Sequence, residues 1–137
     1  MINAIKIAQS GLLAATNRTQ VAARNIVNVN SAGQPAFSVE PSAALQGALA
    51  YQPRRAVNTP TPGGGVRGAS QPISPATFSV FAPNTPAADS NGLVAYPNVS
   101  LAREFTELKL AEHAYKANAV VIGALDEALG EVIDQTE

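Results

Sequence analysis

The sequence has no cysteine, no tryptophan and a single histidine among its 137 residues. Without cysteine there is no disulfide framework, zinc–thiolate site or thiol nucleophile, and the cellular compartment is left open. The net charge is only −1 at pH 7 and the bases are scattered, which argues against nucleic-acid binding. The longest apolar run, residues 119–125 counting Gly123, is far too short to span a membrane.

Proline is absent from both ends of the chain, because all ten prolines lie between Pro35 and Pro97. The flanking stretches are amphipathic, and a chain of 137 residues forms one domain at most. We divide it into an N-terminal assembly helix (1–30), a proline- and glycine-rich middle with short strands (31–97) and a C-terminal assembly helix (98–137). The predicted fold class is mainly α, with two long terminal amphipathic helices packing as a coiled-coil-like pair and a small irregular middle segment that contains a β-hairpin.

The N-terminal stretch, from about Asn3 to Val29, repeats in sevens over nearly four heptads, which is long enough for a coiled-coil-like seam. The second seam position is almost entirely alanine, so a partner helix can approach it closely. The first position holds Ile5, Leu12, Thr19 and Ile26, and the second holds Ala8, Ala15, Ala22 and Val29.

The C-terminal helix is expected to start near Ser100, an N-cap residue that follows the helix-disfavouring Tyr96-Pro97 pair. A large residue then recurs every seven positions, whereas the interleaved seam position is less regular. The recurring residues are Leu101, Leu108, Tyr115, Ile122 and Leu129. The interleaved position holds Phe105, Ala119 and Ile133, with Glu112 and Asp126 interrupting it.

Neither helix is expected to be stable alone. Burying the large residues of the C-terminal stripe gains roughly 8–15 kcal/mol gross, whereas ordering about 35 backbone residues costs ~1–2 kcal/mol each. The stripes must therefore pack against each other or against the same stripes of other copies. Residues 1–30 carry a local charge of +3 and residues 98–137 a local charge of −5, which favours pairing of the two different helices.

The middle segment is punctuated by proline and glycine, which excludes a long helix but allows short strands. The best strand candidates are Thr77–Phe81 and Leu93–Tyr96, the second preceded by a turn at residues 89–92. Ala56-Val57 and Val66-Arg67 are weaker strand candidates. The segment from Gln34 to Ala50 is interpreted as an irregular insertion.

Gly63, Gly65 and Gly68 satisfy the G-x-G-x-x-G spacing of dinucleotide-binding loops. The prolines Pro60 and Pro62 stand where a strand should precede them, and no helix clearly follows. These glycines are therefore interpreted as a turn.

Titratable side chains form no catalytic constellation. The lone His113 has no second histidine or cysteine to complete a metal site, so we expect it to be partly exposed or interfacial. The pairs Glu104–Glu107 and Glu127–Glu131 fall at helical spacing and are interpreted as a solvated face. No catalytic, cofactor-binding or metal-binding residue is predicted, no cofactor is expected, and the protein is not expected to be an enzyme.

Two motifs at opposite ends carry a family resemblance. Residues 23–33, ARNIVNVNSAG, resemble the N-terminal signature of bacterial flagellar rod and hook proteins, and a second motif after residue 98 is similar to their C-terminal one. Residues 89–99, DSNGLVAYPNV, are most similar to the smallest proximal-rod subunits of the flagellar basal body. The motif residues are Asn25, Ile26, Asn28, Asn98, Val99, Tyr115, Ala117 and Asn118.

The resemblance implies a structural rod subunit that self-assembles and co-assembles through its terminal helices and transmits torque for motility. It implies export through the flagellum's own type III apparatus, without a cleaved signal peptide, to the periplasmic rod. The expected partners are other rod subunits, hook–basal-body proteins and the export apparatus, with no nucleic acid and no direct membrane insertion. The predicted assembly interface comprises Ile5, Leu12, Ile26, Leu101, Phe105, Leu108, Tyr115, Ile122 and Leu129.

Two details refine this interpretation. Asn25 and Asn28 are predicted to terminate the first helix through hydrogen bonds from side chain to backbone. The aromatic residue that usually follows the motif's glycine is replaced by Gln34, and the segment 51–54, YQPR, is interpreted as its displaced counterpart after the insertion.

Two alternatives stay open at this point. One is a divergent rod paralogue. The other is a small cytoplasmic coiled-coil regulator or chaperone-like binding module, which explains the heptad stripes but not the motifs at the two ends.

Overall fold

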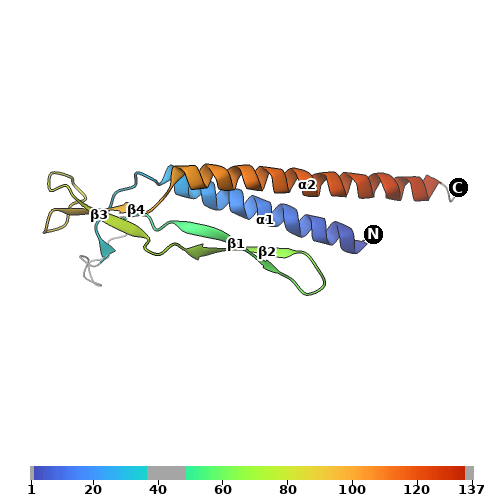
Figure 1. The fold of residues 1–137 in the computed structure, drawn as a ribbon, viewed down its shortest axis with the longest axis horizontal. Coiled ribbons are helices and arrows are strands. Elements are labelled where there is room, and N and C mark those ends of the chain that lie inside the picture. The colour runs from blue at the N-terminus through green and yellow to red at the C-terminus, as the bar shows by residue number, and fades with distance from the viewer. Residues whose placement is uncertain (1, 37–48, 135–137) are drawn as a thin grey trace.

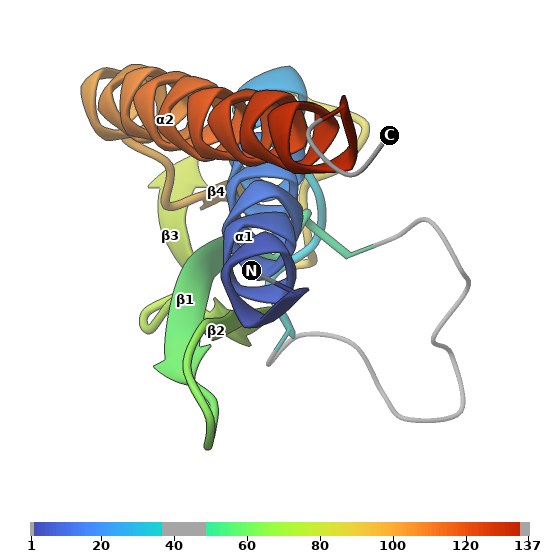
Figure 2. The same ribbon diagram turned by 90° about the vertical axis from the view of Figure 1, so that its right-hand side faces the viewer.

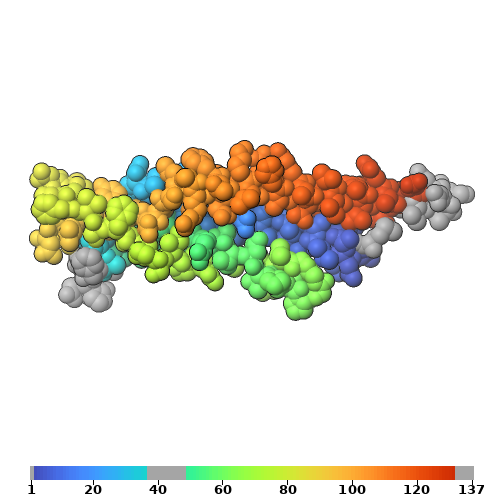
Figure 3. All heavy atoms as spheres, viewed as in Figure 1, coloured from blue at the N-terminus to red at the C-terminus, as the bar shows by residue number. Residues whose placement is uncertain are grey.

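The computed structural model describes residues 2–36 and 49–134. Over this part of the chain the molecule is elongated, with two long helices side by side and the strands arranged below and beyond them (Figures 1 and 3). The elements are α1 (Ile2–Val27), β1 (Arg54–Pro60), β2 (Val66–Pro72), β3 (Thr77–Phe81), β4 (Leu93–Pro97) and α2 (Leu101–Asp134). The expected pair of long terminal helices flanking a strand-containing middle is confirmed.

Helices α1 and α2 run antiparallel, so both chain ends lie at the same end of the molecule (Figure 1). With 26 and 34 residues, they are about 39 and 51 Å long, and α2 extends beyond the start of α1. The β1–β2 hairpin packs on α1 but not on α2, so α1 is the central element between them (Figure 2). The sequence left open whether each helix packs against the other helix of the same subunit or against helices of other copies. In the structure, α1 packs against α2 of the same subunit.

Small residues let α1 pack on two sides at once. The alanine seam is buried as expected at Ala8, Ala15 and Ala22. A second set, Ala14 and Val21, is also buried, on the part of α1 that faces the hairpin. There the backbone of β2 comes so close that a Cβ added at Gly68 would lie 3.1 Å from the Cα of Ala14.

The interleaved position of the α2 seam lies one residue earlier than the heptad analysis predicted, whereas Leu108, Ile122 and Leu129 of the first position are half-buried in the seam as expected. Glu104 and Ala111 are buried, whereas Phe105 and Glu112, at the predicted interleaved position, are exposed. The reason is that α1 offers partners for polar groups. Asn118 lies against Gly11, and Glu107 pairs with Arg18, so α2 turns its small and polar flank inward.

The predicted N-cap is consistent with the start of α2. The helix begins at Leu101, and the Ser100 carbonyl accepts its first α-helical hydrogen bond from the Glu104 amide at 3.0 Å. The remaining seam residues of α2 are half-buried. They are Leu108, Asn118, Ile122, Leu125 and Leu129.

The weaker strand candidates form the β1–β2 hairpin, whose antiparallel register runs from Arg54 opposite Pro72 to Pro60 opposite Val66. Its tip contains Gly63, Gly64 and Gly65, all at positive φ, so the turn predicted for Gly63 and Gly65 is confirmed, whereas Gly68 lies in β2. Ser10 of α1 anchors this end: its Oγ accepts a hydrogen bond from the Val66 amide (3.0 Å) and donates one to the Ile7 carbonyl (2.7 Å).

The stronger strand candidates pair antiparallel as β3 and β4, at the end of the molecule remote from the chain termini (Figure 1). The predicted turn before β4 is present, because the Asp89 carboxylate accepts bonds from the amides of Asn91 and Leu93, and Gly92 has a φ of +73°. Phe78 stacks on Tyr96 across the pair, with ring centroids 6.1 Å apart.

The chain after α1 is fastened to β4 through paired backbone hydrogen bonds between Gly33 and Ala95. Next to this point Gln34 bridges Leu49, and an added Cβ on Gly33 would collide with the backbone of Ala50. Residues 33–34 and 49–50 are therefore neighbours in the fold. Most of the predicted insertion (37–48) lies outside the described residues.

The close contact between Gly11 of α1 and Asn118 of α2 can be tested by substitution. In an ordinary helix, glycine to alanine stabilises by about 1 kcal/mol, and Gly123→Ala should behave this way because an added Cβ meets nothing within 4 Å. Gly11→Ala should instead destabilise the fold by about 1–2 kcal/mol, because its Cβ would overlap the Asn118 side chain. Chemical unfolding followed by circular dichroism measures both, and equal stabilisation by the two variants would contradict the close α1–α2 approach.

Candidate functional site

The most buried polar side chain joins three elements. Asn25, near the end of α1, is 0% exposed. Its Nδ2 donates to the Arg54 carbonyl (2.7 Å), and its Oδ1 accepts from the Arg54 amide (3.2 Å) and the Tyr51 hydroxyl (3.0 Å). Among the described residues β1 pairs with β2 alone, so the Asn25 amide forms hydrogen bonds with the other edge of β1 as a neighbouring strand would. Asn25 therefore attaches α1 to the hairpin. The prediction that its side chain terminates the helix is wrong.

Glu104 of α2 lies beside this junction and is only 5% exposed. Burial raises the pKa of Glu104 above its usual value of 4.5, hydrogen bonding to Asn25 opposes this rise, and the neighbouring Glu107 adds to it. The prediction that Glu104 and Glu107 form a solvated face is wrong. Both turn toward α1, because Asn25 and Arg18 there supply the polar partners that a heptad analysis does not count.

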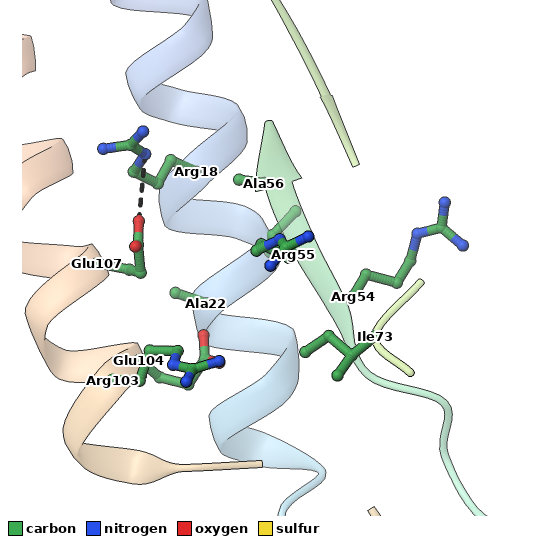
Figure 4. A pocket seen from close by; sticks show the side chains of 10 residues that line it. Arg18, Ala22, Arg54, Arg55, Ala56, Ile73, Arg103, Glu104 and Glu107 are labelled. Atoms are coloured by element: carbon green, nitrogen blue, oxygen red, sulfur yellow. Dashed lines mark ion pairs between the residues drawn. The ribbon is translucent and has the colours of Figure 1, made fainter. Parts of the chain in front are cut away.

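A small cleft separates α1, α2 and β1 at the same place (Figure 4). Arg18 and Glu107 reach toward one another across the two helices, with Nε and Oε2 3.3 Å apart. The cleft holds about 30 Å³, whereas small-molecule sites usually enclose about 300–1,000 Å³. It is a charged junction between elements, too small for a metabolite. Its lining side chains include Arg18, Arg54, Arg55, Arg103, Glu104 and Glu107.

A larger groove of about 530 Å³ runs between α1 and the hairpin. The described residues that line it carry hydroxyl, amide and aliphatic side chains, and Arg67 is the one charged residue among them. The groove thus lacks a pair of groups for acid–base chemistry. Among the described residues no cluster of three or more His, Asp or Glu side chains is placed to hold a metal ion. In the same part of the chain no helix is long and apolar enough to cross a membrane.

The other motif asparagines make local bonds. Asn28 Nδ2 donates to the Arg24 carbonyl (2.8 Å), which confirms its predicted role at the end of α1. Asn98 Nδ2 donates to the Pro75 carbonyl (3.0 Å) just before α2. Asn118 Nδ2 donates to the Ala114 carbonyl (2.7 Å) and lies against Gly11. Of the remaining motif residues, Ile26 and Val99 are half-buried, and Tyr115 and Ala117 are exposed.

The proposed interface residues divide into two groups. Leu101, Phe105 and Tyr115 remain 42%, 56% and 49% exposed along one flank of α2. The other residues are half-buried, and they are Ile5, Leu12, Ile26, Leu108, Ile122 and Leu129. Heptad counting missed further exposed apolar residues, because they fall outside the single stripe that it follows. These include Ile7, Leu13, Phe78, Phe81, Leu110, Val120 and Val121.

No protein-family model matches the chain, but curated proteins resemble it over nearly its whole length. It is 35% identical to the flagellar basal-body rod protein FlgC of Salmonella typhimurium over 126 residues, which are 91% of this chain and 90% of that protein. The protein of the same name from Escherichia coli O157:H7 is 33% identical over the same shares. The Agrobacterium fabrum protein of this name is 30% identical over 139 residues, covering 96% of this chain and 91% of its own.

The chain belongs to the FlgC family of flagellar basal-body rod proteins. The expected membership of the bacterial flagellar rod family is confirmed. In this FlgC-family member, Asn25 of the N-terminal motif meets Glu104, which lies within the span of the C-terminal motif (98–118), at a single junction. The two motifs, almost eighty residues apart in the chain, are therefore neighbours in space.

Removing the Asn25 amide should destabilise the fold severely. Asn25→Ala leaves the Arg54 amide and carbonyl and the Tyr51 hydroxyl without their partner, at about 1–3 kcal/mol for each buried group. We expect a total loss of at least about 3 kcal/mol in the free energy of unfolding, against about 1 kcal/mol for Tyr51→Phe. Asn28→Ala is the matched control, because it removes one exposed bond to the Arg24 carbonyl and one bond from the Ser31 hydroxyl, and their loss should cost only about 1–2 kcal/mol. Equal losses in both asparagine variants would contradict the junction.

Glu104 makes the stability depend on pH. Because its pKa is raised in the fold, its contribution to the unfolding free energy is greatest at acid pH and is lost as the pH rises through that pKa. Glu104→Gln keeps an oxygen for Asn25 and removes the charge, so it should stabilise the fold at about pH 7 and converge with the wild type below about pH 4.

Glu112→Gln provides a control of opposite sign. Hydrogen bonds from Lys116 and Lys109 lower the pKa of Glu112 to about 2, so its contribution is present at neutral pH and fades as the pH falls from 4.5 toward that value. Thermal unfolding across this range measures both variants. A Glu104→Gln variant that is less stable than the wild type at neutral pH would contradict the buried carboxylate.

Proposed function

We propose that this protein is a structural subunit of the flagellar basal-body rod, which assembles helically with other copies and other rod proteins and transmits torque for motility. The observation that carries the proposal is identity of 30–35% to basal-body rod proteins over about nine-tenths of both chains. This likeness favours the rod subunit over the cytoplasmic regulator, because the relatives carry the name of a rod component.

The geometry supports an assembly role. The helices pair within one subunit, which hides the alanine seam but leaves Leu101, Phe105 and Tyr115 exposed on the adjoining flank of α2. Contiguous exposed apolar residues commonly mark surfaces that bind another protein. We propose that this flank packs on neighbouring subunits, and that the α1–α2 pair has coiled-coil-like packing. When one surface of a subunit binds a different surface of the next copy and the repeated rotation does not close a ring, the copies form a helical filament.

The proposed location is the periplasmic rod, reached through the flagellum's own export apparatus. The proposed partners are other rod subunits and hook–basal-body proteins. The relatives are basal-body rod proteins, which supports a location in the basal body, and the motif resemblance supports export. We assign no catalysis and no cofactor to this role.

Fractionation of a flagellated cell tests the function. In a strain lacking this chain, motility should be lost, and a tagged copy should restore it and co-purify with detergent-isolated basal bodies. A tagged copy that stays in the cytosol, while the deletion strain still builds complete rods, would instead support the regulator.

A substitution on the free flank separates assembly from folding. Phe105 is 56% exposed in the subunit, so Phe105→Asp should change its unfolding free energy by less than about 0.5 kcal/mol. In a packed rod the same carboxylate would be buried, at a cost of several kcal/mol per copy. We expect normal unfolding and normal export, but loss of rod incorporation and of swimming.

His113→Asp is the matched control. His113 is also exposed on α2, and it lies away from the flank formed by Leu101 and Phe105. Cells with this variant should swim. Normal swimming with Phe105→Asp as well would show that this flank is not used in the rod.

A further inference from the structure

Only one asparagine of the chain is followed by a glycine. This is Asn91, which precedes Gly92, whereas every other asparagine precedes a residue with a side chain. The Cγ atom of an asparagine can be attacked by the backbone nitrogen of the next residue, which closes a five-membered succinimide ring. A side chain on that next residue hinders the attack, and glycine has none. Asn91 is therefore the asparagine whose chain neighbour hinders this reaction least.

The fold requires a glycine at position 92. Its φ is +73°, a conformation that residues with a Cβ rarely adopt. An added Cβ would also lie 2.9 Å from Cε2 of Phe81 and 3.0 Å from Cβ of Pro83. The Asn91 side chain, by contrast, is exposed and makes no hydrogen bond with the described residues. The reactive pair thus combines a glycine that cannot be exchanged with an amide that nothing in the described fold holds in place.

Hydrogen bonds of the turn restrain the nitrogen that would attack. The Gly92 amide donates to the Asp89 carbonyl (2.9 Å), and the Asp89 carboxylate accepts from the amides of Asn91 (2.9 Å) and Leu93 (2.8 Å). Attack requires the Gly92 nitrogen to lose its proton and approach the Asn91 Cγ, so its bond to the carbonyl must break first. The nearby carboxylate also disfavours the negative charge that this nitrogen acquires. The intact turn therefore opposes the reaction in two ways.

We propose that Asn91 is a site of spontaneous deamidation, which the Asp89 turn suppresses in the folded subunit and which opening of the turn permits. The Gly92 nitrogen forms a bond to the Asn91 Cγ, and the side-chain nitrogen leaves as ammonia, taking up the proton that Gly92 releases. Water then opens the succinimide at either of its two carbonyl carbons. The products are aspartate and isoaspartate, and water is the only co-reactant.

Isoaspartate at position 91 would change the attachment of β4. Its main chain runs through the former side chain and is one carbon atom longer, inside a turn that the Asp89 amide also closes by donating to the Leu93 carbonyl (2.9 Å). Just beyond this turn, Ala95 of β4 exchanges two backbone hydrogen bonds with Gly33 (3.0 and 2.8 Å). We therefore expect the modification to loosen the contact between β4 and the chain after α1.

The rate of deamidation in the folded and unfolded chain tests the proposal. The purified full-length chain is incubated at mildly alkaline pH, with and without guanidinium chloride. Mass spectrometry of the peptide that contains Asn91 detects the exchange of an amide for a carboxyl group, and an isoaspartate-specific methyltransferase identifies the isoaspartate. We expect the folded chain to react at least about tenfold more slowly than the unfolded chain, which corresponds to an opening free energy of about 1.4 kcal/mol.

Three variants separate the turn from the reacting amide. Asp89→Ala removes the carboxylate that accepts two hydrogen bonds, so its folded chain should react at least about threefold faster than the wild type. Asp126→Ala removes an exposed acid of α2 and should leave the rate unchanged. Asn91→Gln keeps an exposed amide but cannot close the five-membered ring, so position 91 should stay unmodified. Amide hydrogen exchange at Gly33 and Ala95 should accelerate in the incubated wild type and not in Asn91→Gln.

Several results would overturn the proposal. Equal rates in the folded and unfolded chain, or an Asp89→Ala variant that reacts no faster than the wild type, would contradict suppression by the turn. An unfolded chain that releases ammonia from other asparagines before Asn91 would contradict the assignment of the site. If Asp89→Ala does not fold, the comparison of the folded and unfolded wild type still decides. None of these results bears on the proposed rod function, because the reaction needs no partner protein.

Discussion

The side-chain amide of Asn25 is the constraint on which the arrangement of the subunit depends. It is fully buried, and it satisfies the backbone amide and carbonyl of Arg54 together with the Tyr51 hydroxyl. Buried polar groups in native proteins are almost always paired, so any shift of α1 relative to the hairpin would leave several groups unpaired at once. Glu104 brings α2 to the same amide. One residue thereby fixes the relative register of α1, β1 and α2.

Given that register, the composition of α1 explains the layered shape. Alanine and glycine on two sides of the helix allow α2 and the hairpin to approach closely, as Gly11 beside Asn118 and Ala14 beside Gly68 show. A helix with large residues at these positions could accept only one neighbour at this distance. Because the small residues of α1 cover little of the larger apolar surface of α2, Leu101 and Phe105 are left exposed. The small residues that allow the close packing of the subunit therefore also leave an apolar surface for assembly.

Local patterns predicted the elements that depend on neighbouring residues. Both helices, the β3–β4 pair, the Asp89–Gly92 turn and the glycine turn at the hairpin tip are present, because spacing, turn chemistry and backbone freedom decide them locally. The two motifs also pointed to the flagellar rod family, which the relatives confirm.

Contacts between distant residues could not be predicted in this way. Heptad counting placed the interleaved position of the α2 seam at Phe105 and Ala119, one residue away from Glu104 and Asn118, because it does not weigh a polar side chain against a partner on another helix. Asn25 and Arg54 are 29 residues apart in sequence, and their bond follows only once the hairpin is placed on α1. Tyr51, interpreted from the sequence as a displaced aromatic residue of the motif, reaches the Asn25 amide. Nothing in the spacing indicated that contact.

The central claim is that the exposed flank of α2 becomes buried in the rod, and a single cysteine at position 105 tests it most directly. The chain has no other cysteine, so a maleimide reagent reports on this site alone. The account predicts rapid labelling of the Phe105→Cys variant in the free, purified subunit and strong protection in isolated basal bodies that contain it. Equally rapid labelling of the assembled and free protein would contradict the account.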